Sequence, residues 1–121
     1  MIVAGFGCRA GASAVSLRAA LDRAQRGVPP ITLLAAPHDK LPALAPLAAT
    51  LGLPITGIAP DALTVIVTPT QSTASLMARG VGSLCEAAAL AAAGPGATLI
   101  GRRVMSPDRM ATCAIAQGQT P

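Results

Sequence analysis

The chain has 121 residues, of which 52% are hydrophobic and 12% charged, and this predicts one folded domain with a core of its own. Its net charge is +4, but the basic residues are scattered and there is one Phe and no Trp or Tyr, which argues against nucleic-acid binding. No apolar run is long enough to span a membrane, and three widely spaced cysteines without a CxxC pair favour the reducing cytoplasm over a disulfide framework or a zinc site.

Apolar runs and helical spacings alternate through the first half of the chain. Strands are predicted at residues 1–6, 31–36 and 54–58, helices at 14–26 and 41–51, and a loop at 37–40. Ser13 is placed to cap the first helix and Gly52 to end the second. Strands that alternate with helices through short loops pair in parallel, with the helices packed against the sheet.

The second half of the chain is less regular. Residues 61–68 carry both helix and strand signals, and residues 69–79 are a polar loop. The next elements are a helix that begins at Ser83, strands at 98–105 and 111–116 joined by a turn at 106–108, and a loose tail at 117–121. Two strands without a helix between them pair antiparallel, so we expect a single α/β domain, residues 1–121, with a mixed, mostly parallel sheet and an antiparallel C-terminal strand pair.

The first glycine-rich stretch, residues 5–11 (GFGCRAG), follows the first predicted strand and leads toward a helix. Glycine lets backbone N–H groups converge, and a helix N-terminus adds unpaired donors, so a turn here suits a carboxylate or a phosphate, with Arg9 beside it. The stretch also matches the dinucleotide fingerprint as Gly5-x-Gly7-x-x-Ala10, although the acid expected after the second strand is missing. A tight turn that binds nothing is the third interpretation.

A second glycine-rich stretch, residues 80–83 (GVGS), leads into the alanine-rich helix. It offers the same kind of anion site, with Arg79 just before it. Ser83 and Glu86 also have the spacing of a capping box, in which the two side chains satisfy the amides at the helix start themselves. A carboxylate there competes with a bound anion, and Arg79 is placed to offset its charge.

Three further side chains are candidates for chemistry. Lys40 follows the second predicted strand, at the edge where open α/β sheets bind ligands, although a solvated surface lysine fits the same pattern. His38 is the only histidine and has no partners at metal-ligand spacing. Cys8 beside Arg9 has the surroundings of a reactive thiol, but no base accompanies it. We therefore expect no metal site and no cofactor, and assign no catalytic residue.

Five short segments occur in an order shared with one known family. They are residues 5–11 (GFGCRAG), Lys40, residues 51–54 (LGLP), residues 80–90 (GVGSLCEAAAL) and residues 112–116 (TCAIA). In these the chain resembles the CobE/CbiG C-terminal domain family of cobalamin biosynthesis over essentially its whole length. Relatives often carry an acidic residue shortly after the lysine, and this chain has none there, so a pairing of Lys40 with such a residue is not expected.

The resemblance implies a three-layer α/β/α domain and a role in building the corrin ring, as in the free-standing CobE-like proteins. It implies a corrin or precorrin intermediate, rich in acetate and propionate groups, as partner, together with other enzymes of the pathway. The candidate ligand-binding residues are Gly5, Gly7, Cys8, Arg9, Gly11, Lys40, Arg79, Gly80, Gly82, Ser83 and Glu86. Two alternatives stay open: an enzyme related to cobalt-precorrin-5A hydrolase that uses Cys8 or His38, and a nucleotide-binding module that uses the first glycine turn.

Overall fold

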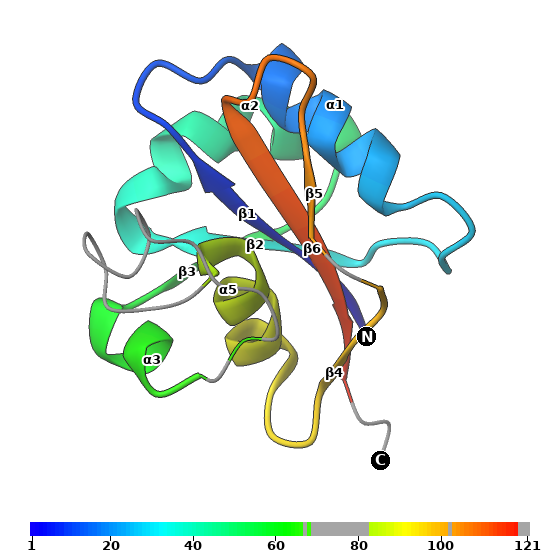
Figure 1. Ribbon diagram of the computed structural model, residues 1–121, viewed down its shortest axis with the longest axis vertical. Coiled ribbons are helices and arrows are strands. Elements are labelled where there is room, and N and C mark those ends of the chain that lie inside the picture. The colour runs from blue at the N-terminus through cyan, green and yellow to red at the C-terminus, as the bar shows by residue number, and fades with distance from the viewer. Residues whose placement is uncertain (67, 69–82, 102, 119–121) are drawn as a thin grey trace.

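A mixed β-sheet forms the middle layer of the protein, with helices on both of its faces (Figure 1). The computed structural model describes residues 1–66, 68, 83–101 and 103–118. In chain order the elements are β1 (Ile2–Cys8), α1 (Ala14–Ala24), β2 (Leu33–Pro37), the 3-10 helix η1 (His38–Lys40), α2 (Leu41–Leu51), β3 (Ile55–Ile58), α3 (Pro60–Thr64), α5 (Leu84–Ala93), β4 (Thr98–Leu99), β5 (Val104–Met105) and β6 (Ala111–Gln117). The expected three-layer α/β class is confirmed.

The sheet is mixed because β6 runs against its neighbours. The strand order is β3-β2-β1-β6-β4, and β5 also pairs with β6. β1 pairs in parallel with β2 and β2 with β3, whereas β6 is antiparallel to β1, β4 and β5. Among the described strands β6 alone is therefore reversed, which confirms the mostly parallel sheet with antiparallel C-terminal strands. The carboxyl ends of β1, β2 and β3 reach the left-hand side of Figure 1.

Alternate residues of β1 point to opposite faces of the sheet, as the period of a strand requires. Phe6 is buried on one face with Leu17 of α1 and Leu44 of α2. Val3 is buried on the other face, where it packs with alanines of α5 such as Ala87. The core thus consists of two clusters, one on each side of the sheet, and small alanine side chains let α5 lie close to its strands.

The local signals for helix ends are confirmed. Ser13 caps α1, since its Oγ accepts a hydrogen bond from the backbone N–H of Ser16 at 3.2 Å. Gly52 ends α2 in the left-handed conformation, with a φ of +67°. Arg18 and Asp22, one turn apart on α1, form an exposed ion pair at 3.1 Å.

The predicted strand at 31–36 is β2 (Leu33–Pro37), the helix predicted at 14–26 ends at Ala24, and the strand predicted at 54–58 begins at Ile55. Three larger differences concern β1 and the C-terminal strands. β1 continues as far as Cys8 because the start of β6 pairs with it there, with Cys8 opposite Ala111. Residues 98–105 form two short strands instead of one, and Gly101 between them has a φ of +76°. Gln117, predicted to lie in a loose tail, is the last residue of β6 and pairs with β1.

The segment predicted as a loop at 37–40 consists largely of η1, which runs directly into α2. The ambiguous segment 61–68 contributes to the short helix α3. The polar loop predicted at 69–79 lies outside the described residues. Within the described residues, every helix is too short or too polar to cross a bilayer.

Candidate functional site

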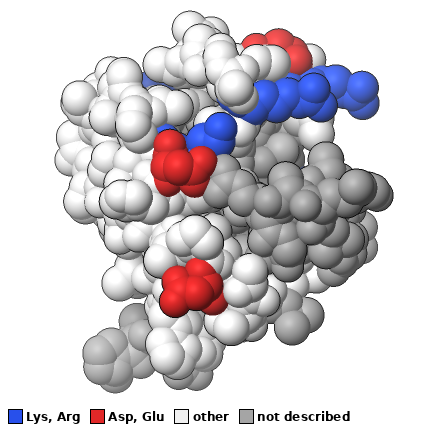
Figure 2. All heavy atoms as spheres, turned by 90° about the vertical axis from the view of Figure 1, so that its left-hand side faces the viewer, with Lys and Arg blue, Asp and Glu red and all other residues white. Residues whose placement is uncertain are grey.

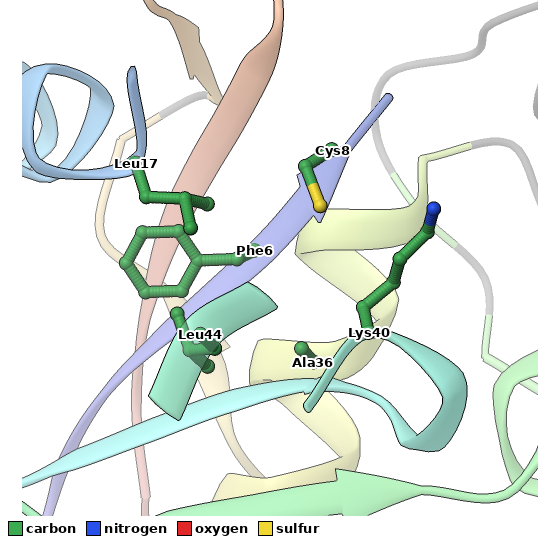
Figure 3. A pocket seen from close by; sticks show the side chains of 6 residues that line it. All are labelled: Phe6, Cys8, Leu17, Ala36, Lys40 and Leu44. Atoms are coloured by element: carbon green, nitrogen blue, oxygen red, sulfur yellow. The ribbon is translucent and has the colours of Figure 1, made fainter. Parts of the chain in front are cut away.

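β1 and β2 end side by side at the carboxyl edge of the sheet, and side chains from these strand ends and the adjoining helices surround a small hollow (Figure 3). It spans about 160 Å³ when the open solvent at its mouth is counted, but it has no room for a water molecule, and it is lined by Phe6, Cys8, Leu17, Ala36, Lys40 and Leu44. Phe6, Leu17 and Leu44 form an apolar wall, whereas Cys8 and Lys40 stand on the side of the strand ends. The predicted position of Lys40 at this edge is therefore confirmed.

The first two glycines lie inside β1 and face α5, so the prediction that they form a turn is wrong. A Cβ on Gly5 would stand 2.2 Å from Cys85 O and 2.5 Å from Ala89 N. A Cβ on Gly7 would stand 2.9 Å from Thr112 Oγ1. Pairing with β6 keeps this stretch extended, and the missing side chains let α5 approach the sheet. The dinucleotide fingerprint needs its first glycine in the turn itself, which this geometry does not provide.

The close approach of α5 brings Ser83, the last residue of the second glycine-rich stretch, and the start of α5 against the end of β1. Ser83 Oγ lies 3.6 Å from Cys85 Sγ, and Thr112 Oγ1 donates a hydrogen bond to Gly7 O at 3.3 Å. Burial raises the pKa of the Cys85 thiol, and hydrogen bonds with Thr112 and Ser83 partly offset that rise. Gly7 from the first glycine-rich stretch and Ser83 from the second thus belong to one polar cluster between β1, β6 and α5.

The start of α5 does not have the geometry of a capping box. The Ser83 side chain makes no hydrogen bond to the helix amides and lies beside the Cys85 thiol instead, so the Ser83 half of that prediction is wrong. Glu86 is completely buried in the first turn of the helix. When ionised, a carboxyl group at this place repels a second anion, so the helix start alone is a weak anion site.

Sequence reasoning missed one cation near this cluster. Arg103 precedes β5 and is partly buried. Burial has the largest effect on the pKa of Cys85 and raises it, whereas the nearby positive charge of Arg103 lowers it. The signal that could have found it is the Arg102-Arg103 pair, the only adjacent arginines in the chain. Arg102 itself lies outside the described residues.

A turn does follow β1, but it begins at Arg9. The Arg9 N–H donates to Met110 O at 2.9 Å, and the Arg9 carbonyl accepts from Ala12 N at 3.1 Å. Gly11 has a φ of +84°, a left-handed conformation that other residues adopt only with strain. The backbone of Arg9 is therefore held on both sides, while its side chain is exposed.

Arg9 and Lys40 make no ion pair or side-chain hydrogen bond with any other described residue. This distinguishes them from Arg18, which pairs with Asp22, and from Arg23, which donates to a backbone carbonyl of β5 at 3.0 Å. Figure 2 shows the face of the strand ends, with basic side chains across its upper part and acidic ones beside and below them. Two positive charges at this edge are thus available to an anionic ligand.

The remaining candidates lie elsewhere or cannot be placed. His38 packs beside β3, since a Cβ on Gly57 would stand 2.9 Å from His38 Nδ1, and it does not line the hollow. Arg79, Gly80 and Gly82 lie outside the described residues. Among the described residues, no three His, Cys, Asp or Glu side chains gather as a bound metal ion would require.

A family model described as cobalamin synthesis G C-terminus matches residues 2–116. The chain belongs to this family. The crystal structure of CobE, a protein from the cobalamin (vitamin B12) biosynthetic pathway, is 34% identical, with a TM-score of 0.86 over all of this chain and 92% of that one. No curated protein sequence matches the chain. This member of the CbiG C-terminal family is therefore a cobalamin biosynthesis protein, as the resemblance predicted.

Two further solved structures share the fold. Cobalamin biosynthesis protein ChiG from Agrobacterium tumefaciens is 34% identical, with a TM-score of 0.77 over 99% of this chain and 100% of that one. A homologue of cobalamin biosynthesis protein G from Sulfolobus solfataricus is 17% identical, with a TM-score of 0.73. The match covers 98% of this chain but 37% of that protein, so it concerns the fold of one part of a longer chain.

Proposed function

We propose that the protein binds a corrin or precorrin intermediate, a macrocycle that carries several carboxylates, at the carboxyl edge of β1 and β2. One observation carries the proposal. In a member of a cobalamin biosynthesis family, Arg9 and Lys40 stand without partners among the described residues, at the edge where open α/β sheets bind their ligands. Guanidinium and ammonium groups form charge-assisted hydrogen bonds with carboxylates, which suits the acetate and propionate groups of such a ring.

The size of the hollow decides how the ligand would lie. Pockets that enclose drug-sized molecules hold roughly 300–1,000 Å³, whereas this hollow has no room for a water molecule between its lining side chains. The ring therefore lies across the strand ends outside the hollow, and Phe6 and Leu17 stay buried beneath it. A ring held this way keeps one face open, which suits a protein that passes its ligand to another enzyme of the pathway.

The other candidate residues take different roles in this proposal. Gly11 lets the loop turn beside Arg9, and Cys8 borders the hollow. Gly5 and Gly7 act indirectly, because they bring α5 and Ser83 against β1. A ligand role for Glu86, Arg79, Gly80 and Gly82 stays a prediction. The three cysteines form no disulfide, which supports the cytoplasm as the place of action.

Titration with cobyrinic acid, a corrin polycarboxylate, tests the proposal through the corrin absorbance and the heat of binding. Removing one charge-assisted hydrogen bond costs about 1.5–3 kcal/mol, so Arg9→Gln and Lys40→Gln should each weaken binding about 10- to 100-fold. Arg26→Gln, which removes the same charge beyond the far end of α1, is the matched control and should bind as the wild type does. In cobalamin these side chains are amides and not carboxylates, so cobalamin should bind more weakly than cobyrinic acid.

The proposal is wrong if neither absorbance nor heat changes at about 100 µM cobyrinic acid. The Kd would then exceed about 100 µM, and the free energy of binding would be less than about 6 kcal/mol. It is also wrong if the Arg26 variant loses as much affinity as the Arg9 variant, because the charge would then act at long range and not through a site. Both results would leave family membership unchanged.

One observation favours a catalytic alternative. The Cys8 thiol and Lys40 border the same hollow, so a ligand group that lies over the strand ends beside Lys40 would also be near a nucleophile. Conversion of a corrin precursor that stops in Cys8→Ser and continues in His38→Ala would support this role. Equal pathway output from the wild type and from both variants would dismiss it.

A further inference from the structure

The turn between β5 and β6 places an arginine where the backbone favours glycine. Arg109 has a φ of +63°, and it is the one non-glycine residue with a positive φ among the described residues. The Arg109 N–H donates to Ser106 O at 2.9 Å, which closes a tight turn with Pro107 at its second position. In a hairpin, the residue at the place of Arg109 is usually glycine, because glycine adopts a left-handed conformation without strain.

Hydrogen bonds hold this turn in place. Asp108 Oδ1 accepts from Ser106 Oγ at 2.6 Å and from Met110 N at 3.1 Å, and Oδ2 accepts from Ser16 Oγ of α1. The turn is thereby fixed to the first turn of α1, and the left-handed conformation of Arg109 is imposed by its surroundings. The Asp108 carboxylate is occupied by these bonds.

The turn lies beside the loop that carries Arg9. The Arg9 N–H donates to Met110 O at 2.9 Å, so Arg109 is adjacent to a residue that is hydrogen-bonded to Arg9. Figure 1 shows both loops at the upper end of the molecule, where α1 begins. The Arg109 side chain is exposed and, within the described part of the chain, makes no hydrogen bond or ion pair.

We propose that Arg109 is a further ligand-binding residue, which meets a carboxylate of the same polyanionic ligand beside Arg9; this inference rests on the proposed function. The turn holds Arg109 in a left-handed conformation that is strained for any residue other than glycine, and the Arg109 side chain makes no hydrogen bond or ion pair within the described part of the protein. An intermolecular contact accounts for an arginine at such a position, because backbone strain is characteristically retained where a side chain is needed for binding. Arg9, Lys40 and Arg109 then present three cations from the segments that follow β1, β2 and β5.

Arg109→Gly tests the inference because it should move stability and affinity in opposite directions. Glycine relieves the left-handed strain, although it also loosens the unfolded chain, so the melting temperature should rise by about 2–4 °C. The Kd for cobyrinic acid should increase about 10-fold or more with the loss of one charge-assisted contact. Arg109→Lys keeps the charge and should bind within about threefold of the wild type. Arg26→Gln serves again as the matched charge control.

The outcomes separate this inference from the function on which it rests. If the wild type binds cobyrinic acid and Arg109→Gly binds equally well, Arg109 is not a ligand residue and the proposed function stands. A variant that is both less stable and weaker in binding would also overturn the inference, because the arginine would then serve the fold. If the wild type fails to bind, the proposed function and this inference both fall.

Discussion

Gly5→Ala should destabilise the protein strongly, because this glycine sets the distance between β1 and α5. The added methyl group would stand 2.2 Å from Cys85 O, 2.5 Å from Ala89 N and 2.7 Å from Ala89 Cβ. Two of these atoms belong to the helix backbone, so no change of side-chain conformation relieves the overlap. Ordinary contact between such atoms needs more than 3 Å, which requires α5 to move by about 1 Å.

The size of the effect follows from that displacement. Overpacking a core costs about 1–3 kcal/mol, and overlap with backbone atoms belongs at the upper end, near 3 kcal/mol. The entropy of unfolding is about 2.1 cal/mol/K per residue, or about 0.25 kcal/mol/K for a chain of this length. A loss of about 3 kcal/mol therefore lowers the melting temperature by about 12 °C.

Thermal unfolding followed by circular dichroism measures this shift, and Gly11→Ala is the matched control. Gly11 has no atom within 4 Å of its Cβ position but has a φ of +84°, so alanine there should cost about 1 kcal/mol, or about 4 °C. A Gly5 variant that unfolds within about 2 °C of the wild type, or no earlier than the Gly11 variant, would refute the close packing of α5 on β1.

Two further predictions concern titrating groups. Hydrogen bonds from Ser106, then Ser16, hold the pKa of Asp108 below its usual value of 3.8, so their stabilisation is present above that pH and is lost as the pH falls through the lower, folded-state pKa. Asp108→Asn should thus be less stable than the wild type at neutral pH, and the gap in melting temperature should close in acid; a gap that is constant with pH would contradict this. Burial raises the pKa of Cys113 well above 9.0 and also raises that of Cys85, so Ellman's reagent should react first with the partly exposed Cys8. Fast labelling that persists in Cys8→Ser would contradict that order.

Much of the fold could be predicted from the sequence because its signals are local. The Ser13 cap, the Gly52 helix end and the alternation of apolar runs each depend on residues within one or two turns of chain. The mixed sheet followed from two strands without a helix between them. Lys40 could be placed at the carboxyl edge because it follows a strand that pairs in parallel.

The errors arose where a residue's environment comes from distant segments. A Gly-x-Gly sequence is compatible with a turn or with a strand. Here it forms a strand, because it pairs with β6, which lies about a hundred residues later in the sequence. Ser83 was expected to cap α5, but its hydroxyl lies beside the Cys85 thiol. Arg103 could not be assigned to the site, because its proximity to Cys85 exists only once β5 pairs with β6.

The amino-acid sequence alone determined the order of strands and helices, their class and the family, because backbone preferences and hydrophobic periodicity act over short distances. Only the tertiary structure decided which charges at the carboxyl edge have no partner among the described residues, and which glycines face a helix instead of a ligand. The physical reason is that these contacts join segments that are far apart in the chain. For such segments the number of residues between them does not tell how far apart they lie in space. Arg109 illustrates this, since its left-handed backbone is imposed by a hydrogen-bonded turn anchored on α1.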